Sequence, residues 1–306
     1  MGISLSTAWN ASGYHNGREI IQEIKNLGFS EIELSFNLTR KIVEDILAAV
    51  QNKEIRVNSL HNYCPIPEGL ERKEALPDCY SLASTNEKER AQALKYTKVT
   101  IDTASRLNAR AVVLHCGRVE IPDHTRELIS FYNNVEMTCP KAKRLIGNIQ
   151  KERARKAPAY INAALKSLEE LSSYAAELKI NLGVENRFYF REIPSFTETG
   201  KILEHFKGSN VYYWHDTGHA QLWENLGLLK HKEYLDNYSQ YLLGVHLHDI
   251  LGAYDHKAPL TGNFDFRLLL PYLKKDTIKT LEPHYPASSA EIVFAKEYLE
   301  NLYDAD

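Results

Sequence analysis

The sequence predicts an α/β fold, a single (β/α)8 TIM barrel. Short β-branched or apolar runs alternate with longer segments of helical period along the chain, and eight such pairs can be counted in 306 residues. This alternation is typical of βα units around a parallel sheet, and a barrel of about 250 residues commonly forms one domain, here 1–306. An open doubly wound sheet is the alternative, but it favours a glycine-rich phosphate fingerprint after the first strand, which the sequence lacks.

The first four strands are predicted where short apolar runs stand between helical segments. In chain order they are ISLS (3–6), EIELS (31–35), IRVNSL (55–60) and AVVLH (111–115). The helical segments that follow them lie at 17–27, 39–51, 87–107 and 160–178. Each run is short enough for a strand, and each helical segment is long enough to cross back over the sheet.

The second half of the chain repeats the pattern. Its strands are predicted at INLGVE (180–185), VYYWH (211–215), LGVHLH (243–248) and IKTLE (278–282). Its helices are predicted at 198–207, 227–241, 266–274 and 289–301. Eight strand–helix pairs fit a closed barrel.

Two long loops follow strands three and four, at 62–86 and 116–158. In a barrel this places them on the catalytic face, where long loops form substrate walls or lids. The second contains the basic stretches KAKR and KERARK. These suit a solvated helix face, and the alternative is a contact from Arg153, Arg155 or Lys156 to an anionic group such as a sugar phosphate.

Composition narrows the class of protein. No apolar run approaches the ~18 residues of a membrane-spanning helix, and the first residues lack the layout of a signal peptide, so we expect a cytoplasmic protein without a membrane partner. Four widely spaced cysteines favour free thiols. A net charge of −3 gives no footprint for nucleic acid, which makes nucleic acid an unlikely partner.

Histidines and carboxylates gather at the ends of strands three to eight. The segments are SLHNY, VLHCG, GVENR, WHDTGHA, GVHLHD and TLEPH. In a barrel all of these ends face one mouth. Buried ionisable groups need a shared cation or a hydrogen-bonded network to offset their desolvation. Each residue taken alone has another explanation, a scaffold hydrogen bond or an ordinary ion pair, but their joint occurrence favours a metal site.

Four of these residues form the predicted metal site: Glu185, Asp216, His246 and Glu282. They come from four different strands and offer one nitrogen and several carboxylate oxygens. This set suits manganese, cobalt or magnesium, and zinc is also compatible. His219, three residues after Asp216, can join the metal shell or donate to a substrate hydroxyl.

Further residues near these strand ends are candidates for holding a substrate or supporting the ligands. Asn186 and Arg187 follow the fifth strand and are placed to hydrogen-bond neighbours or substrate. Trp214 is a candidate substrate-binding residue, and Trp214, Tyr189, Phe190 and Trp223 can form apolar walls for a sugar or pack in the core. His215 and His248 fit a supporting role behind the ligands.

The stretches VENR, HDTGHA, HLHD and DH followed by APLTGNFDF resemble the xylose isomerase-like TIM barrel superfamily, in particular its sugar phosphate isomerase/epimerase branch, which is related to endonuclease IV. The likeness runs from the His61 strand to Glu282, and His256, Gly262 and Asp265 take places in its last motif. The resemblance implies one catalytic metal held by the predicted four residues, a small-molecule carbohydrate substrate and a homodimer.

The endonuclease IV pattern uses further histidines and an aspartate to hold three zinc ions. His61, His115, His219 and His256 stand where that pattern has histidines, and these side chains could instead contact sugar hydroxyls. The position two before His256, where the pattern has aspartate, is Tyr254, and Asp255 is one residue off register.

The chemistry expected from these residues is metal-dependent isomerisation or epimerisation of a sugar or sugar phosphate through an enediolate. Glu185 and Glu282 are the predicted catalytic pair, one removing a proton beside the carbonyl and the other returning it. Dehydration of a keto-inositol or keto-sugar, or cleavage of a keto-glycoside, would begin with the same enolisation. A multi-zinc phosphodiesterase like endonuclease IV and a sugar-binding barrel without activity are also compatible with the pattern.

Overall fold

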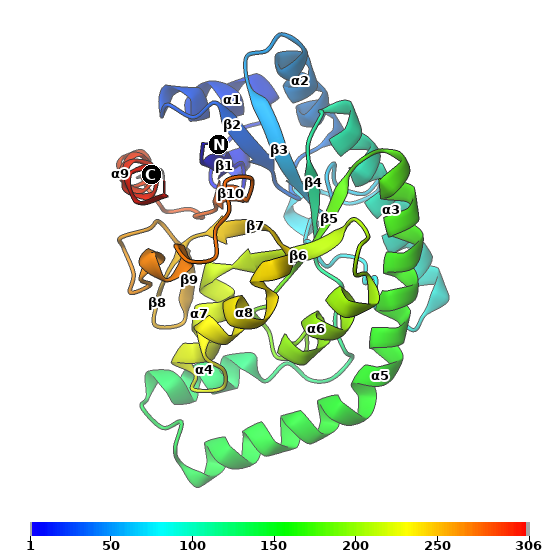
Figure 1. Cartoon of the computed structure of the whole chain (residues 1–306), viewed down its shortest axis with the longest axis vertical. Helices are drawn as coiled ribbons and strands as arrows, with labels where there is room; N and C mark the ends of the chain where they lie inside the picture. The colour runs from blue at the N-terminus through cyan, green and yellow to red at the C-terminus, as the bar shows by residue number, and fades with distance from the viewer. Residues whose placement is uncertain (1, 304–306) are drawn as a thin grey trace.

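Eight parallel strands close into a barrel in the computed structural model, which describes residues 2–303 (Figure 1). Their order around the barrel is β1-β10-β7-β6-β5-β4-β3-β2. Their bounds are β1 Ser4–Ser6, β2 Glu31–Leu34, β3 Arg56–His61, β4 Ala111–Leu114, β5 Asn181–Glu185, β6 Val211–Asp216, β7 Leu242–Leu247 and β10 Ile278–Leu281. The predicted (β/α)8 barrel is confirmed, and every predicted strand matches within one residue at each end.

Helices surround this barrel (Figure 1). They are α1 Gly17–Asn26, α2 Arg40–Gln51, α3 Glu87–Arg106, α4 Thr125–Asn133, α5 Pro140–Glu177, α6 Phe196–His205, α7 Thr217–Asn225, α8 His231–Tyr238 and α9 Ser289–Tyr303. Short 3-10 turns lie at Ala11–Gly13, Arg72–Glu74, Ser239–Tyr241 and Phe266–Leu269. A two-stranded antiparallel hairpin, β8 Asp249–Leu251 with β9 Tyr254–Lys257, follows β7 at the mouth.

The connection after β4 differs from the predicted loop 116–158, because most of it is helical. It contains α4 and the first half of α5, which begins at Pro140 with the Cys139 Sγ accepting from the Ala142 N–H at 3.3 Å. Proline is favoured in the first turn of a helix, where its missing N–H needs no partner. Pro158 lies inside α5, and Figure 1 shows this helix bending about halfway along its length.

Two predicted helices are shorter than expected, and one further helix was not predicted. The helix expected at 227–241 is α8, followed by the 3-10 turn Ser239–Tyr241. The unpredicted helix α7 precedes it, and the turn between α7 and α8 contains Gly227 with a positive φ of 69°. The segment 266–274 forms only the 3-10 turn Phe266–Leu269, and Pro271, which follows it, has no N–H to extend a helix. The connection 62–86 is irregular apart from one 3-10 turn, as expected.

The interior of the barrel is filled around Trp214. This side chain is fully buried and packs with Ala111, Val113 and Ile278. Gly183 and Gly244 on the flanking strands leave the space for its ring, since a Cβ at either position would collide with the indole. The packed layer closes the barrel beneath the C-terminal strand ends, so the ionisable side chains above it share one enclosed floor.

Two simpler expectations concern the cysteines and the membrane. The four cysteines, which lie within the described residues, are free thiols, as predicted. Between residues 2 and 303, none of the helices combines the length and the apolar character needed to cross a membrane.

Candidate metal centre and active site

The four predicted metal ligands meet at the C-terminal mouth of the barrel. Glu185 ends β5, Asp216 ends β6, His246 lies in β7 and Glu282 directly follows β10. All four are buried, and one ligand atom from each lies within 4.8 Å of the others. The Nδ1 atom of His246 is 2.6 Å from the nearer Glu185 oxygen, 3.0 Å from Glu282 and 3.8 Å from Asp216. The structure therefore brings the four residues together.

The chemistry of this group fits a divalent cation. Ligands bound to one ion at about 2.1 Å lie roughly 3 Å apart, which is the spacing seen around His246 Nδ1. Burial raises the pKa of Glu282 to about 8; His246 opposes the rise, and the Glu33 and Glu185 carboxylates add to it. Carboxylates crowded together in this way carry more negative charge than the site's imidazole balances, and a divalent cation would offset the excess.

Glu33 contacts the candidate metal ligand His246 from behind, and no sequence pattern singled it out. The Nε2 atom of His246 lies 3.0 and 3.1 Å from the two Glu33 oxygens, and the Ser59 hydroxyl donates to Glu33 at 2.7 Å. Although burial alone would lower it, the Glu282 and Glu33 carboxylates raise the pKa of His246 well above its usual range. A carboxylate behind a metal-binding histidine fixes the ring orientation and directs the other nitrogen to the ion.

A second group of possible ligands adjoins the first on the β3–β4 side. It consists of His61, His115 and Glu185, and Glu185 therefore belongs to both groups. The Nε2 atom of His115 is 2.6 Å from Glu185, and that of His61 is 3.9 Å away. The Nδ1 atom of His115 faces Asp78 at 3.3 Å, a residue of the 62–86 connection that sequence patterns gave no reason to select.

A third group lies on the hairpin side of the mouth and contains His219, His248 and His256. The ring N–H of His219 donates to the Asn186 carbonyl at 3.0 Å, which leaves its Nε2 atom 3.9 Å from the Asp255 carboxylate. The Nε2 atom of His256 is 3.7 Å from the same carboxylate. Asp255 thus lies beside this group, although the endonuclease IV pattern has its aspartate one residue earlier, at the position of Tyr254. The Tyr254 side chain is exposed.

His248 lies between Asp216 and the β8–β9 hairpin. Its Nε2 atom lies 2.9 Å from an Asp216 oxygen, and its Nδ1 atom accepts the backbone N–H of His256 at 2.9 Å. His215 lies behind the site and bonds to Tyr213 at 2.7 Å and His231 at 2.8 Å. Because the ring nitrogens of both histidines are occupied by neighbouring protein groups, these residues position others rather than face the cavity.

The three predicted substrate-binding residues have different environments. Arg187 lines the cavity at the mouth, donating to Glu185 at 2.8 Å and to Glu192 at 3.0 Å, and so holds Glu185 in place. Asn186 is fully buried and bonds to the backbone of Asp216 through both ends of its amide. Trp214 lies in the barrel interior and does not line that cavity, so we assign it to packing.

A cavity of about 560 Å³ lies above these groups. Its floor includes the side chains of His61, His115, Glu185, His219, His256 and Glu282. Phe36, Phe188 and Tyr189 supply apolar surface, and Arg118, Arg126, Arg187 and Arg191 supply guanidinium groups. The volume suits a small organic substrate, and the mixture of apolar and polar walls suits a sugar.

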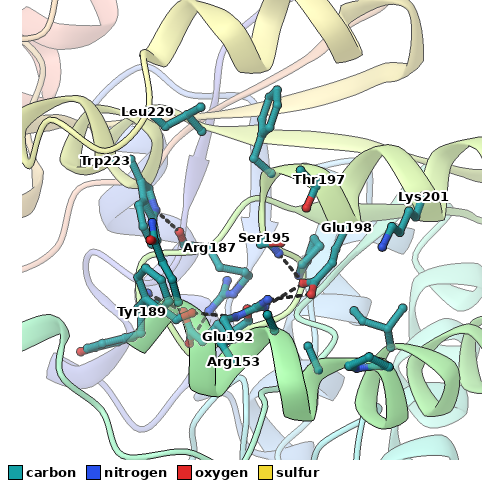
Figure 2. A pocket seen from close by; sticks show the side chains of 18 of the residues that line it. Arg153, Arg187, Tyr189, Glu192, Ser195, Thr197, Glu198, Lys201, Trp223 and Leu229 are labelled. Carbon is teal, nitrogen blue, oxygen red and sulfur yellow. Dashed lines mark hydrogen bonds and ion pairs between the residues drawn. The ribbon is translucent and has the colours of Figure 1, made fainter. Parts of the chain in front are cut away.

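A second cavity of about 660 Å³ lies behind the loop that carries Arg187 (Figure 2). Phe190 and Trp223 line it, rather than the cavity at the barrel mouth. Figure 2 shows Arg153 facing Glu198, and its guanidinium nitrogens lie 2.6 and 2.7 Å from the two carboxylate oxygens. Arg153 also donates to the Glu192 carbonyl at 2.7 Å, so this arginine braces the loop and is not available to an anionic ligand in the mouth.

Known proteins resemble this chain in sequence and fold. Residues 21–297 match the family described as xylose isomerase-like TIM barrel. No curated protein matches the sequence. Among solved structures, a D-tagatose 3-epimerase-like protein is 21% identical with a TM-score of 0.68, over 100% of this chain and 98% of that chain.

Two further structures extend the comparison. The 3-keto-D-glucoside 4-epimerase YcjR from E. coli is 16% identical with a TM-score of 0.68, over 98% of this chain and 99% of that chain. The IOLI protein with a binding zinc atom is 13% identical with a TM-score of 0.69, over 100% of this chain and 99% of that chain. At these identities the likeness establishes a shared fold.

Proposed function

The chain belongs to the xylose isomerase-like TIM barrel family, and from this we propose that it is a divalent-metal-dependent isomerase or epimerase of a sugar or sugar phosphate. The observation that carries the proposal is the buried group of Glu185, Asp216, His246 and Glu282 at the floor of a sugar-sized cavity. Similar folds are those of sugar epimerases, which supports the same class of chemistry.

Glu185, Asp216, His246 and Glu282 would hold the metal. Their oxygen-rich donor set favours manganese, cobalt or magnesium over zinc, although the similar IOLI protein binds zinc. When bound, the ion would polarise the substrate carbonyl and so lower the cost of forming an enediolate beside it. The chain's own residues move the protons.

Glu185 and Glu282 are proposed as the two proton-transferring groups. They project into the mouth from β5 and from the end of β10, strands that β6 and β7 separate in the barrel. One carboxylate takes the proton from the carbon beside the carbonyl, and the electron pair moves into the enediolate. The other, protonated, returns a proton to the opposite face of that carbon for epimerisation. For isomerisation the proton goes to the neighbouring carbon, and a proton also moves from the adjacent hydroxyl oxygen to the former carbonyl oxygen.

Neighbouring groups position this pair. Arg187 and His115 bond to the same Glu185 oxygen at 2.8 and 2.6 Å, so that carboxylate is fixed in orientation. Ser6 donates to Glu282 at 3.3 Å. The ring N–H of His219 is held by the Asn186 carbonyl, which leaves its Nε2 atom free to accept from a substrate hydroxyl.

The test is exchange of deuterium from solvent into ketoses, ketose phosphates and inosones, followed by NMR with metal-loaded protein. Glu185→Gln and Glu282→Gln should each slow exchange by about 10²–10⁴-fold, because each removes a general acid or base. The matched control is Glu31→Gln, a buried strand carboxylate that bonds to Arg56 and Asn58 away from the mouth. Metal content and thermal unfolding are measured for every variant, and near wild-type exchange in either catalytic variant would refute the two-carboxylate mechanism.

The same assay distinguishes related reactions on the same metal. Loss of water or of an aglycone from the exchanging substrate would identify a dehydratase or a lyase, which share the enolisation step. A sugar-binding barrel without activity would bind a ketose and show no exchange at any metal loading.

A second candidate function is a multi-metal phosphodiesterase, and one observation favours it. The Asp255 carboxylate lies beside His219 and His256. The third group therefore has a carboxylate next to its histidines, although the endonuclease IV pattern has aspartate one position earlier, where this chain has Tyr254. About three tightly held zinc ions per chain, together with cleavage of abasic duplex DNA, would establish this function. One exchangeable ion, with deuterium uptake into a ketose, would exclude it.

A further inference from the structure

Three arginines on one side of the active-site cavity have no role in the proposed proton transfer. Arg118, Arg126 and Arg191 all line the cavity that contains Glu185 and Glu282. None belongs to the basic stretches KAKR and KERARK that sequence patterns singled out. A neutral sugar does not require three guanidinium groups, so they call for a ligand of opposite charge.

The backbone holds these three arginines on one scaffold. The Val119 N–H donates to the Arg191 carbonyl at 2.8 Å, and Arg118 forms an isolated antiparallel bridge with Glu192. The N–H of Phe190 donates to the Thr125 hydroxyl at 2.8 Å, which ties the loop to the first turn of α4, where Arg126 lies. The segment after β4, the loop after β5 and the start of α4 therefore form one wall of the cavity.

The charges of these arginines are largely available to a ligand. Within residues 2–303, the side chains of Arg126 and Arg191 form no hydrogen bond or ion pair, and Arg118 bonds only to the exposed Glu120 at 3.1 Å. The carboxylates of the cavity have other partners: Asp78 and Glu192 face Arg187, and Asp123 accepts the Thr125 N–H at 3.0 Å. The wall thus presents the guanidinium groups of Arg126 and Arg191 without a partner among the described residues, beside the Asp123 carboxylate, which bonds to a neutral backbone N–H.

Arg153, Arg155 and Lys156, the alternative anion contact considered from the sequence, do not compete for this role. The guanidinium group of Arg153 is already paired with the buried Glu198 carboxylate. Arg155 and Lys156 line neither cavity, and Lys156 pairs with Glu152 at 3.2 Å. The anion contact is therefore placed on a different set of residues, on the first part of the same connection and on the loop after β5.

We propose that Arg118, Arg126 and Arg191 form a subsite for the phosphate monoester of a phosphorylated ketose whose carbonyl end lies at the metal ligands. This deepens the proposed function and rests on it. A phosphate monoester carries close to two negative charges and three acceptor oxygens, and guanidinium groups bind such oxygens through paired hydrogen bonds. The small cavity and the net charge of −3 favour a small phosphorylated sugar over a nucleic acid.

The first experiment measures binding, independently of turnover. Inorganic phosphate, and ketopentoses and ketohexoses in free and phosphorylated form, are titrated into the metal-loaded protein by calorimetry. The phosphorylated form should bind at least tenfold more tightly than the free form of the same sugar. Arg126→Gln and Arg191→Gln should each reduce that preference by about tenfold, since each removes a charge-assisted hydrogen bond. Arg155→Gln is the matched control and should leave binding unchanged.

The outcomes separate this subsite from the proposed function. Equal binding of free and phosphorylated sugars, or a preference that survives in both arginine variants, overturns the subsite. Equally tight binding of the matching sugar carboxylate, or tighter binding of duplex DNA than of any sugar phosphate, also overturns it. Selective binding of a sugar phosphate without deuterium exchange in any ketose leaves the subsite standing and refutes the isomerase or epimerase.

Discussion

Glu33 gives the sharpest prediction, because among the described residues it reaches the candidate metal centre through His246. Both Glu33 oxygens approach the same His246 nitrogen, at 3.0 and 3.1 Å, and the residue is fully buried. In Glu33→Gln the amide oxygen still accepts from His246, and the Ser59 hydroxyl, now 2.7 Å from the carboxylate, can accept from the new amide. The ring stays oriented while the negative charge behind it is lost.

The expected cost follows from that loss of charge. Removing a carboxylate partner behind a metal-binding histidine lowers metal affinity by about 10- to 100-fold, which corresponds to roughly 1.4–2.7 kcal/mol. We therefore expect Mn²⁺ or Co²⁺ to bind Glu33→Gln about 10- to 100-fold more weakly than wild type, measured by titration calorimetry of metal-free protein.

Glu31→Gln provides the control for this measurement. It removes a buried carboxylate from the same strand, but Glu31 bonds to Arg56 and Asn58 and not to a metal ligand. It should lower the stability of the fold and leave metal affinity unchanged. Wild-type metal affinity in Glu33→Gln, or an equal loss in both variants, would show that Glu33 does not tune His246.

Two further predictions concern stability. Arg153→Met should lower the free energy of unfolding, measured in urea, by about 3–5 kcal/mol, because it leaves the buried Glu198 carboxylate without its partner. The control Arg155→Met, at an exposed neighbouring position, should change it very little. Similar values for the two variants would contradict the buried ion pair. Burial, helped by His215, lowers the pKa of His231 well below its usual range. Below about pH 6.5 the unfolded state therefore binds a proton at this residue and the folded state does not. As a result the free energy of unfolding decreases by about 1.4 kcal/mol for each unit by which the pH is lowered. In His231→Gln the slope of unfolding free energy between pH 6 and 4.5 should be shallower by about that amount, and an unchanged slope would mean that His231 is protonated in the folded protein.

The strands and the convergence of the four candidate ligands could be predicted because both depend on local signals and on one topological rule. Short apolar runs mark the strands, and every parallel strand of a barrel ends at the same mouth. Once Glu185, Asp216 and His246 are placed at strand ends, their convergence follows without knowing any distance. The helix α7 was missed because Gly218 argues against a helix in sequence, although glycine is required there: a Cβ would collide with the His248 ring.

The supporting residues could not be predicted because no local pattern distinguishes them. Glu33 stands within EIELS beside Glu31, and only the closure of the barrel shows that one carboxylate meets His246 and the other meets Arg56. Asp78 lies in an irregular connection whose path is set by tertiary contacts. The arginine wall has the same origin, since Arg118, Arg126 and Arg191 are spread over 74 positions and share a surface only after folding.

Asp255 shows how a register argument fails at an irregular hairpin. In a regular strand, consecutive side chains point to opposite faces, so a carboxylate one position away from the expected one would point away from the site. The β8–β9 pairing contains a register shift, and His256 has a left-handed φ of 50°, so Asp255 and His256 both line the cavity. The third group therefore keeps a carboxylate with its histidines, and sequence register cannot decide between one metal and three. Metal stoichiometry decides it directly: a protein that holds one ion tightly uses His219 and His256 for substrate or structure, whereas three ions make the same residues ligands.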